Sequence, residues 1–150
     1  MKNKSIIRNA EIINENQQYI GDISIEDSYI SEIKAGSISG SFDNEFDASG
    51  LIAIPGMIDD QVHFREPGRT HKGKISTEAI AAVAGGVTSF MEMPNTIPNA
   101  ITNEELEKKY LIGQNNSFGN YSFYLGASND NIEEVKRLDK KNICGVKIFM

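Results

Sequence analysis

The chain has 150 residues and a formal charge of −6, from 15 basic and 21 acidic side chains. Hydrophobic residues make up 39% and glycine adds 13 residues, a globular composition that excludes a disordered or collagen-like chain. The acidic balance argues against sequence-independent nucleic-acid binding, which requires a basic surface. The lack of a long apolar run argues against a membrane span. The start carries no signal core and the single cysteine is Cys144, so we expect a cytoplasmic protein.

The first fifty residues predict a small β-subdomain. Isoleucines alternate with polar residues in three stretches that Asn, Gly and Ser separate, namely residues 5–13, 18–27 and 28–36. This alternation is typical of strands with one buried face. We therefore assign residues 1–52 to a small, β-sandwich-like subdomain.

After Gly50 the pattern alternates between strands and helices. Strands are predicted at residues 51–64, 87–93, 121–128 and 144–150. Helices are predicted between them, starting at Ser76, at the capping box Thr102–Glu105 and at Asp130. The order βαβαβαβ predicts an α/β fold with a parallel sheet covered by helices. Residues 53–150 would then be the first half of a barrel that continues beyond Met150, because the chain stops inside an apolar strand.

The densest cluster of polar side chains lies at residues 59–68. If the strand continues through this cluster, Asp59, Gln61, His63 and Arg65 share one face. In a parallel barrel that face points inward and its carboxyl end opens into the active site. Four polar groups there need partners, which a metal or an anionic substrate would supply. The alternative is a strand end in solvent, with His63 an ordinary loop histidine.

Two other positions could carry chemistry. Asn95 follows the second predicted barrel strand in the run Met93–Pro98 and offers both donors and an acceptor; the alternative is a simple Pro/Asn turn. Lys147 lies mid-strand between Val146 and Ile148, and alternation turns it inward. An inward amine can form a carbamate with carbon dioxide, whose oxygens could bridge two metals. The alternative is a salt-bridged lysine.

Together these motifs resemble the dihydroorotase class of the amidohydrolase superfamily. The class opens with a small β-subdomain and a strand of the form PG-x-ID-x-H-x-H-x-REPG, which here runs from Pro55 to Gly68. Its A-GG-T and MPNT-P elements match residues 84–88 and 93–98. The resemblance implies a TIM (β/α)8 barrel with one or two zinc ions at its mouth. It covers nearly the whole chain.

The resemblance also implies roles for individual residues. His63 matches the second histidine of the metal pair, and Lys147 matches a position that is carbamylated in many superfamily members. Arg65 and Asn95 match residues that grip the substrate carboxylate, and the general-base aspartate belongs to a later strand beyond residue 150. One departure stands out: Gln61 replaces the first histidine of the pair, and glutamine is a poor zinc ligand.

The activity implied is reversible hydrolysis of (S)-dihydroorotate to N-carbamoyl-L-aspartate, in pyrimidine biosynthesis. Allantoinases are similar here but carry another residue in place of Arg65. Two rivals stay open: another cyclic amidohydrolase of allantoinase type, and a non-catalytic homologue, which Gln61 supports. The predicted partners are a small-molecule substrate and a second copy of the chain. We expect the 150-residue chain alone to be inactive, because part of the active site lies beyond it.

Overall fold

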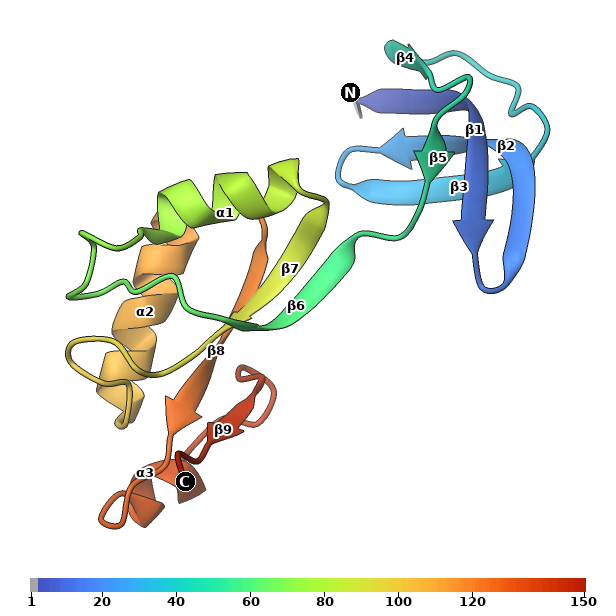
Figure 1. Ribbon diagram of the computed structural model, residues 1–150. Helices are drawn as coiled ribbons and strands as arrows, with labels where there is room; N and C mark the ends of the chain where they lie inside the picture. Colours follow the sequence, from blue (N-terminus) through green and yellow to red (C-terminus); the bar gives the residue numbers. More distant parts are fainter. Residues whose placement is uncertain (1–2) are drawn as a thin grey trace. The chain divides into compact units, whose positions relative to one another are not determined.

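A computed structural model describes residues 3–150 of the chain. The chain forms two compact units, which divide between Pro55 and Gly56. The first unit is a β-sheet, and the second alternates strands with helices (Figure 1). Among the described residues, no helix combines the length and the apolar character that crossing a membrane requires.

The first unit is one five-stranded sheet of mixed direction. Its strands are β1 (Lys4–Asn14), β2 (Gln17–Glu26), β3 (Tyr29–Ala35), β4 (Asn44–Asp47) and β5 (Ile52–Ala53). β1 pairs with β2 in antiparallel fashion, and on its other edge pairs with β4 and then with β5 in parallel fashion. The β1–β2 register shifts between Ile7 and Ala10, and Asn9 has a φ of 58°. This bulge bends β1, as Figure 1 shows, so that one strand serves two partners. The expected β-subdomain is therefore present, but as a single bent sheet and not as the sandwich-like arrangement that was predicted.

A buried charge stabilises the bend. Asp22 is 1% exposed and accepts hydrogen bonds from Arg8 Nη1 at 2.8 Å, from Asn9 N at 3.0 Å and from Ile38 N at 3.0 Å. Burial opposes ionisation, but these three bonds outweigh it and hold the pKa of Asp22 below its ordinary value. The carboxylate therefore ties the bulge to its neighbouring strand and to the loop after β3.

The second unit is built on a parallel four-stranded sheet with the order β6-β7-β8-β9. The strands are β6 (Met57–Val62), β7 (Val87–Glu92), β8 (Asn120–Gly126) and β9 (Gly145–Lys147). Consecutive parallel strands in sequential order, with a helix in each connection, are the arrangement of a barrel of this type. The predicted α/β fold is confirmed as far as this parallel half-barrel; a full barrel is not present in the described residues.

Three helices connect these strands, namely α1 (Ile75–Ala84), α2 (Asn103–Asn116) and α3 (Ile132–Lys136). The Thr102 side chain caps α2 by accepting from Glu105 N at 3.2 Å, as the capping box predicts. The other two predicted starts are wrong by one or two residues: α1 begins at Ile75 with Lys74 as its N-cap, and α3 follows Asn131.

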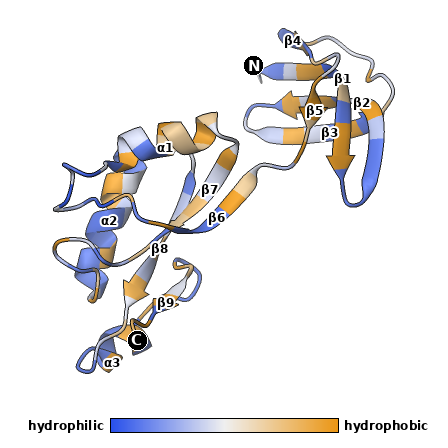
Figure 2. Ribbon diagram, in the orientation of Figure 1, coloured by the Kyte–Doolittle hydropathy of each residue, from blue (hydrophilic) through white to orange (hydrophobic). Residues whose placement is uncertain are grey.

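The core of this unit lies between the sheet and the first two helices. Figure 1 shows α1 and α2 on the same side of the sheet, and Figure 2 shows apolar residues along the strands they cover. The buried cluster consists of Phe64, Ile75, Ala79, Phe90, Leu106, Phe123 and Leu125. Because Phe64 belongs to this cluster, the core also anchors the segment that carries His63 and Arg65.

Candidate active site

The sequence-predicted site residues gather at one edge of the parallel sheet. The four strands run in the same direction, so their carboxyl ends meet at this edge. His63 directly follows β6, Asn95 lies three residues after β7, and Lys147 is the last residue of β9. This is the edge at which parallel α/β sheets bind ligands.

The predicted strand face of four polar residues is correct only in part. β6 ends at Val62, so His63 and Arg65 lie in the following loop. The β6–β7 register also shifts between Asp59 and Val62, which places an extra residue in β6. A bulge of this kind breaks the two-residue alternation. Asp59 instead accepts a hydrogen bond from its neighbour's backbone, Gln61 N, at 3.1 Å.

His63 and Asn95 are brought together across the two strand ends. His63 Nδ1 lies 2.9 Å from Asn95 Oδ1. Because an amide oxygen only accepts, Nδ1 donates this hydrogen bond, and in the neutral imidazole the lone pair then lies on Nε2. A histidine held in this way by an oxygen acceptor is oriented for metal binding or proton transfer through its other nitrogen.

Arg65 lies two residues further along the same loop and is half-buried. Its φ of 69° places it in the left-handed region, which is strained for a side chain of this size. The loop is held against the Asn95 loop by a hydrogen bond from Ile97 N to Pro67 O at 3.1 Å. Gly68 makes this approach possible, since a Cβ there would lie 2.1 Å from Ile97 O. The two loops therefore form one packed unit.

A buried ion pair lies under these loops. Glu92, the last residue of β7, pairs with Lys109 of α2, and each side chain is 1% exposed. Lys109 Nζ also donates to Met93 O at 2.9 Å and lies 5.1 Å from the centre of the Phe123 ring. Burial raises the pKa of Glu92 and lowers that of Lys109, while their mutual attraction opposes both shifts.

Sequence reasoning did not identify Lys109, although a signal was present. The buried residues of α2 are Leu106, Lys109 and Gly113, a helical stripe that contains one cation. Sequence reasoning also gave no role to Glu66. Its Oε2 accepts a hydrogen bond from Ile75 N at 2.8 Å and so caps α1. Glu66 thus fastens the loop after β6 to the start of the first helix.

Lys147 lies at the same edge, at the end of β9. It pairs with Gly126 of β8, and its carbonyl accepts from Ala127 N at 2.8 Å. The side chain is half-buried, with Nζ 5.7 Å from the centre of the Phe149 ring. Within the described part of the chain, no hydrogen bond joins Lys147 to His63.

The residues at this edge of the sheet supply one good metal ligand. His63 has the right chemistry and orientation, whereas Gln61 offers only a neutral amide. Across residues 3–150, no group of three or more His, Cys, Asp and Glu side chains lies close enough together to hold a metal ion. A metal bound here would need further ligands.

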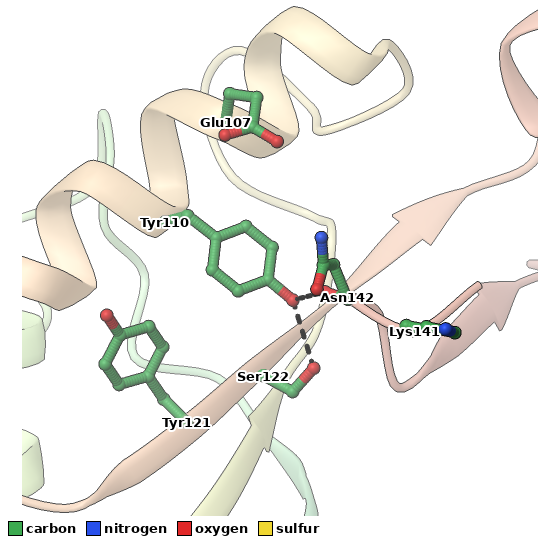
Figure 3. A pocket seen from close by; sticks show the side chains of 6 residues that line it. All are labelled: Glu107, Tyr110, Tyr121, Ser122, Lys141 and Asn142. Carbon is green, nitrogen blue, oxygen red and sulfur yellow. Dashed lines mark hydrogen bonds between the residues drawn. The ribbon is translucent and has the colours of Figure 1, made fainter. Parts of the chain in front are cut away.

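A separate hollow of about 530 Å³ lies between α2, β8 and the loop before β9. Figure 3 shows the Tyr110 hydroxyl pointing toward Ser122 and Asn142. It bonds Ser122 Oγ at 3.1 Å and the Asn142 carbonyl, and burial raises its pKa. The hollow is lined by Glu107, Tyr110, Tyr121, Ser122, Lys141 and Asn142. These residues are distinct from the strand-end site, and the central hydroxyl already has its partners.

A protein-family model matches just over half of the chain. Residues 50–126 match the family model described as Dihydro-orotase-like. Allantoinases of Deinococcus radiodurans and Salmonella paratyphi B are 33% and 34% identical over 146 residues, which is 97% of this chain and 32% of each relative.

Solved structures give the same picture of the fold. The L-hydantoinase (dihydropyrimidinase) of Arthrobacter aurescens matches 97% of this chain with a TM-score of 0.89 at 22% identity, a likeness of fold alone. A dihydropyrimidinase from Brevibacillus agri matches 98% with a TM-score of 0.81 at 25% identity. The chain spans about a third of the length of these relatives.

Proposed function

Because this chain belongs to the dihydro-orotase-like family, we propose that the protein carrying it is a cyclic amidohydrolase acting on (S)-dihydroorotate. In the hydrolytic direction, the hydroxyl of water adds to the ring carbonyl carbon and its proton goes to the ring nitrogen as the C–N bond breaks. The product is N-carbamoyl-L-aspartate. The observation that carries the proposal is the His63–Asn95 contact of 2.9 Å, with Arg65 in the same packed loop.

Arg65 and Asn95 are the proposed carboxylate-binding residues. A guanidinium forks onto a carboxylate through two parallel hydrogen bonds, and an amide N–H adds another. With its Oδ1 toward His63, Asn95 keeps its amide NH2 free to donate. Holding the carboxylate in this way fixes the ring relative to the reacting groups, and orientation of this kind lowers the barrier.

Zinc is the proposed metal, with His63 Nε2 and a carbamylated Lys147 as the ligands that this chain supplies. When bound, zinc lowers the pKa of a coordinated water and polarises a carbonyl. The support is the oriented imidazole and the position of Lys147 at the same sheet edge.

A second candidate substrate is allantoin. The observation in its favour is the 33–34% identity to curated allantoinases over nearly the whole chain. Allantoin has no carboxylate, so this activity would leave the Arg65 guanidinium without the anion that suits it. A non-catalytic homologue is the third candidate, and Gln61 supports it.

Assay of the full-length protein distinguishes these candidates. The protein is purified with zinc and incubated separately with dihydroorotate, allantoin and hydantoin, and ring opening is followed for each. We expect a kcat/KM for dihydroorotate at least tenfold above that for the other two. Faster turnover of allantoin would replace the first proposal with the second, and inactivity on all three would favour a non-catalytic role.

Replacing Gln61 with histidine is expected to increase the zinc content of the full-length protein. The variant adds an imidazole on the strand that leads to His63, and imidazole binds zinc far better than an amide does. Zinc per chain is measured by elemental analysis after dialysis against a weak chelator. Gln114→His, on the exposed surface of α2, is the control for adventitious binding. An unchanged zinc content in Gln61→His would contradict the idea that this position weakens a metal site.

A further inference from the structure

Burying the ion pair of Glu92 and Lys109 carries a large desolvation penalty. Both side chains are 1% exposed, and moving two charges out of water costs much of what their attraction returns. Two apolar residues of similar volume would stabilise the same position at least as well. Stability alone is therefore a weak reason for charges at this place.

The contacts of the pair point to another reason. Lys109 Nζ donates to Met93 O at 2.9 Å, and Met93 begins the loop that carries Asn95. Glu92 directly precedes Met93 and pairs with Val62 at the end of β6, so its carboxylate is fixed to the strand end from which the Asn95 loop starts. The ion pair thus holds the start of the loop that carries Asn95.

The same loops are joined above the pair. His63 contacts Asn95, and Ile97 N donates to Pro67 O at 3.1 Å. Met93 N also donates to Val62 O at 3.0 Å, where β6 ends. The backbone at Arg65 is strained, with a φ of 69°, so it needs surrounding contacts to hold it. These contacts come from the Asn95 loop, whose first residue, Met93, is held by Lys109.

We propose that Glu92 and Lys109 are positioning residues. They fix the backbone at Met93 and so align Asn95 on the substrate carboxylate, and they align Arg65 through the hydrogen bonds that join its loop to the Asn95 loop. Lys109 acts from α2 and Glu92 from the end of β7, and neither contacts the substrate. The catalytic readout of this proposal rests on the proposed function. The structural readout does not.

The test uses the full-length protein with both charges removed, as Glu92→Met together with Lys109→Met. Methionine is unbranched and adapts to irregular space, so the double variant keeps the volume and leaves no unpaired charge. We expect it to fold, with KM for dihydroorotate raised at least tenfold and kcat changed less. The control is Lys108→Met, because Lys108 lies next in sequence and forms exposed ion pairs with Glu104 and Glu105.

Hydrogen–deuterium exchange followed by mass spectrometry gives the readout that is independent of activity. We expect peptides covering residues 63–68 and 93–98 to exchange at least tenfold faster in the double variant, while β1–β3 and α1 keep their rates. Uniformly faster exchange would indicate a merely structural role and overturn the proposal. Unchanged exchange in both loops would overturn it too, whatever the activity.

Glu92→Gln together with Lys109→Gln is the second variant in case the first double variant does not fold. It removes both charges but keeps polar side chains that can hydrogen-bond to each other, and the same loop-restricted increase in exchange is expected. If the wild-type protein hydrolyses none of dihydroorotate, allantoin and hydantoin, the proposed function fails. The exchange result still decides whether the ion pair positions the loops. If the wild-type protein is active and the variant matches it in both KM and loop exchange, positioning fails and the function stands.

Discussion

Replacing Arg65 with alanine is expected to lower kcat/KM for dihydroorotate by about 100-fold, mainly through a higher KM. Truncating one partner of a buried, charged hydrogen-bonded pair costs about 2–5 kcal/mol, and each 1.4 kcal/mol is a factor of ten. Steady-state kinetics of the full-length protein measure the effect. The substitution leaves the backbone strain unchanged, since alanine and arginine both carry a Cβ at the φ of 69°.

Two further variants make this result specific. Arg65→Lys keeps the charge but loses the planar fork, so we expect an intermediate KM. Lys72→Ala removes an exposed cation from the same connection and should leave KM unchanged. If Arg65→Ala leaves the KM for dihydroorotate unchanged, Arg65 does not bind the substrate carboxylate. This result would also favour allantoin, which carries no such group.

Local signals in the sequence predict where a helix begins when a residue at its own start forms the cap. Thr102 caps α2 with its own side chain, so the capping box locates that start. α1 begins earlier than Ser76 because a distant residue, Glu66, accepts the Ile75 N–H. α3 begins after Asn131, whose side chain is occupied by Ser128 N, Ile101 O and Gly126 O. Tertiary contacts of this kind leave no local pattern.

The candidate site could be located from the sequence, but not its support. The positions of His63 and Asn95 after successive parallel strands predict their proximity, because such strand ends share an edge. The alternation rule fails between Asp59 and Arg65, because a bulge lies before Val62 and Arg65 has a left-handed backbone. Lys109 was overlooked because a lysine on a helix is normally solvated, and only the apolar stripe around it indicates burial.

The core beneath the site links stability to activity through Phe64 and Phe90. Phe64 lies between His63 and Arg65 in the chain, and its ring centre is 4.5 Å from that of Phe90. Phe90 is 1% exposed and also lies near Tyr121, at 6.3 Å between ring centres. The loop that carries both site residues is therefore also anchored to the core through Phe64, so weakening the packing of Phe64 against Phe90 should disturb the site.

Replacing Phe90 with alanine is expected to lower the free energy of unfolding by about 3–5 kcal/mol, because it leaves a cavity that the packed core cannot close. Urea denaturation measures this loss. We also expect kcat/KM per folded molecule to fall, since Phe64 loses the partner that holds His63 and Arg65 in place. Phe118→Ala removes a ring that is 73% exposed and should change neither quantity.

Phe90→Leu separates packing from the aromatic contact. Leucine fills most of the space, so we expect a loss below about 1.5 kcal/mol with the activity per folded molecule largely retained. If Phe90→Ala unfolds at the wild-type urea concentration, the cluster around Phe64 is not the core that supports these loops. If it is destabilised but its folded molecules are fully active, the core stabilises the fold without orienting the site, and alignment then depends on the ion pair and on the hydrogen bonds between the loops.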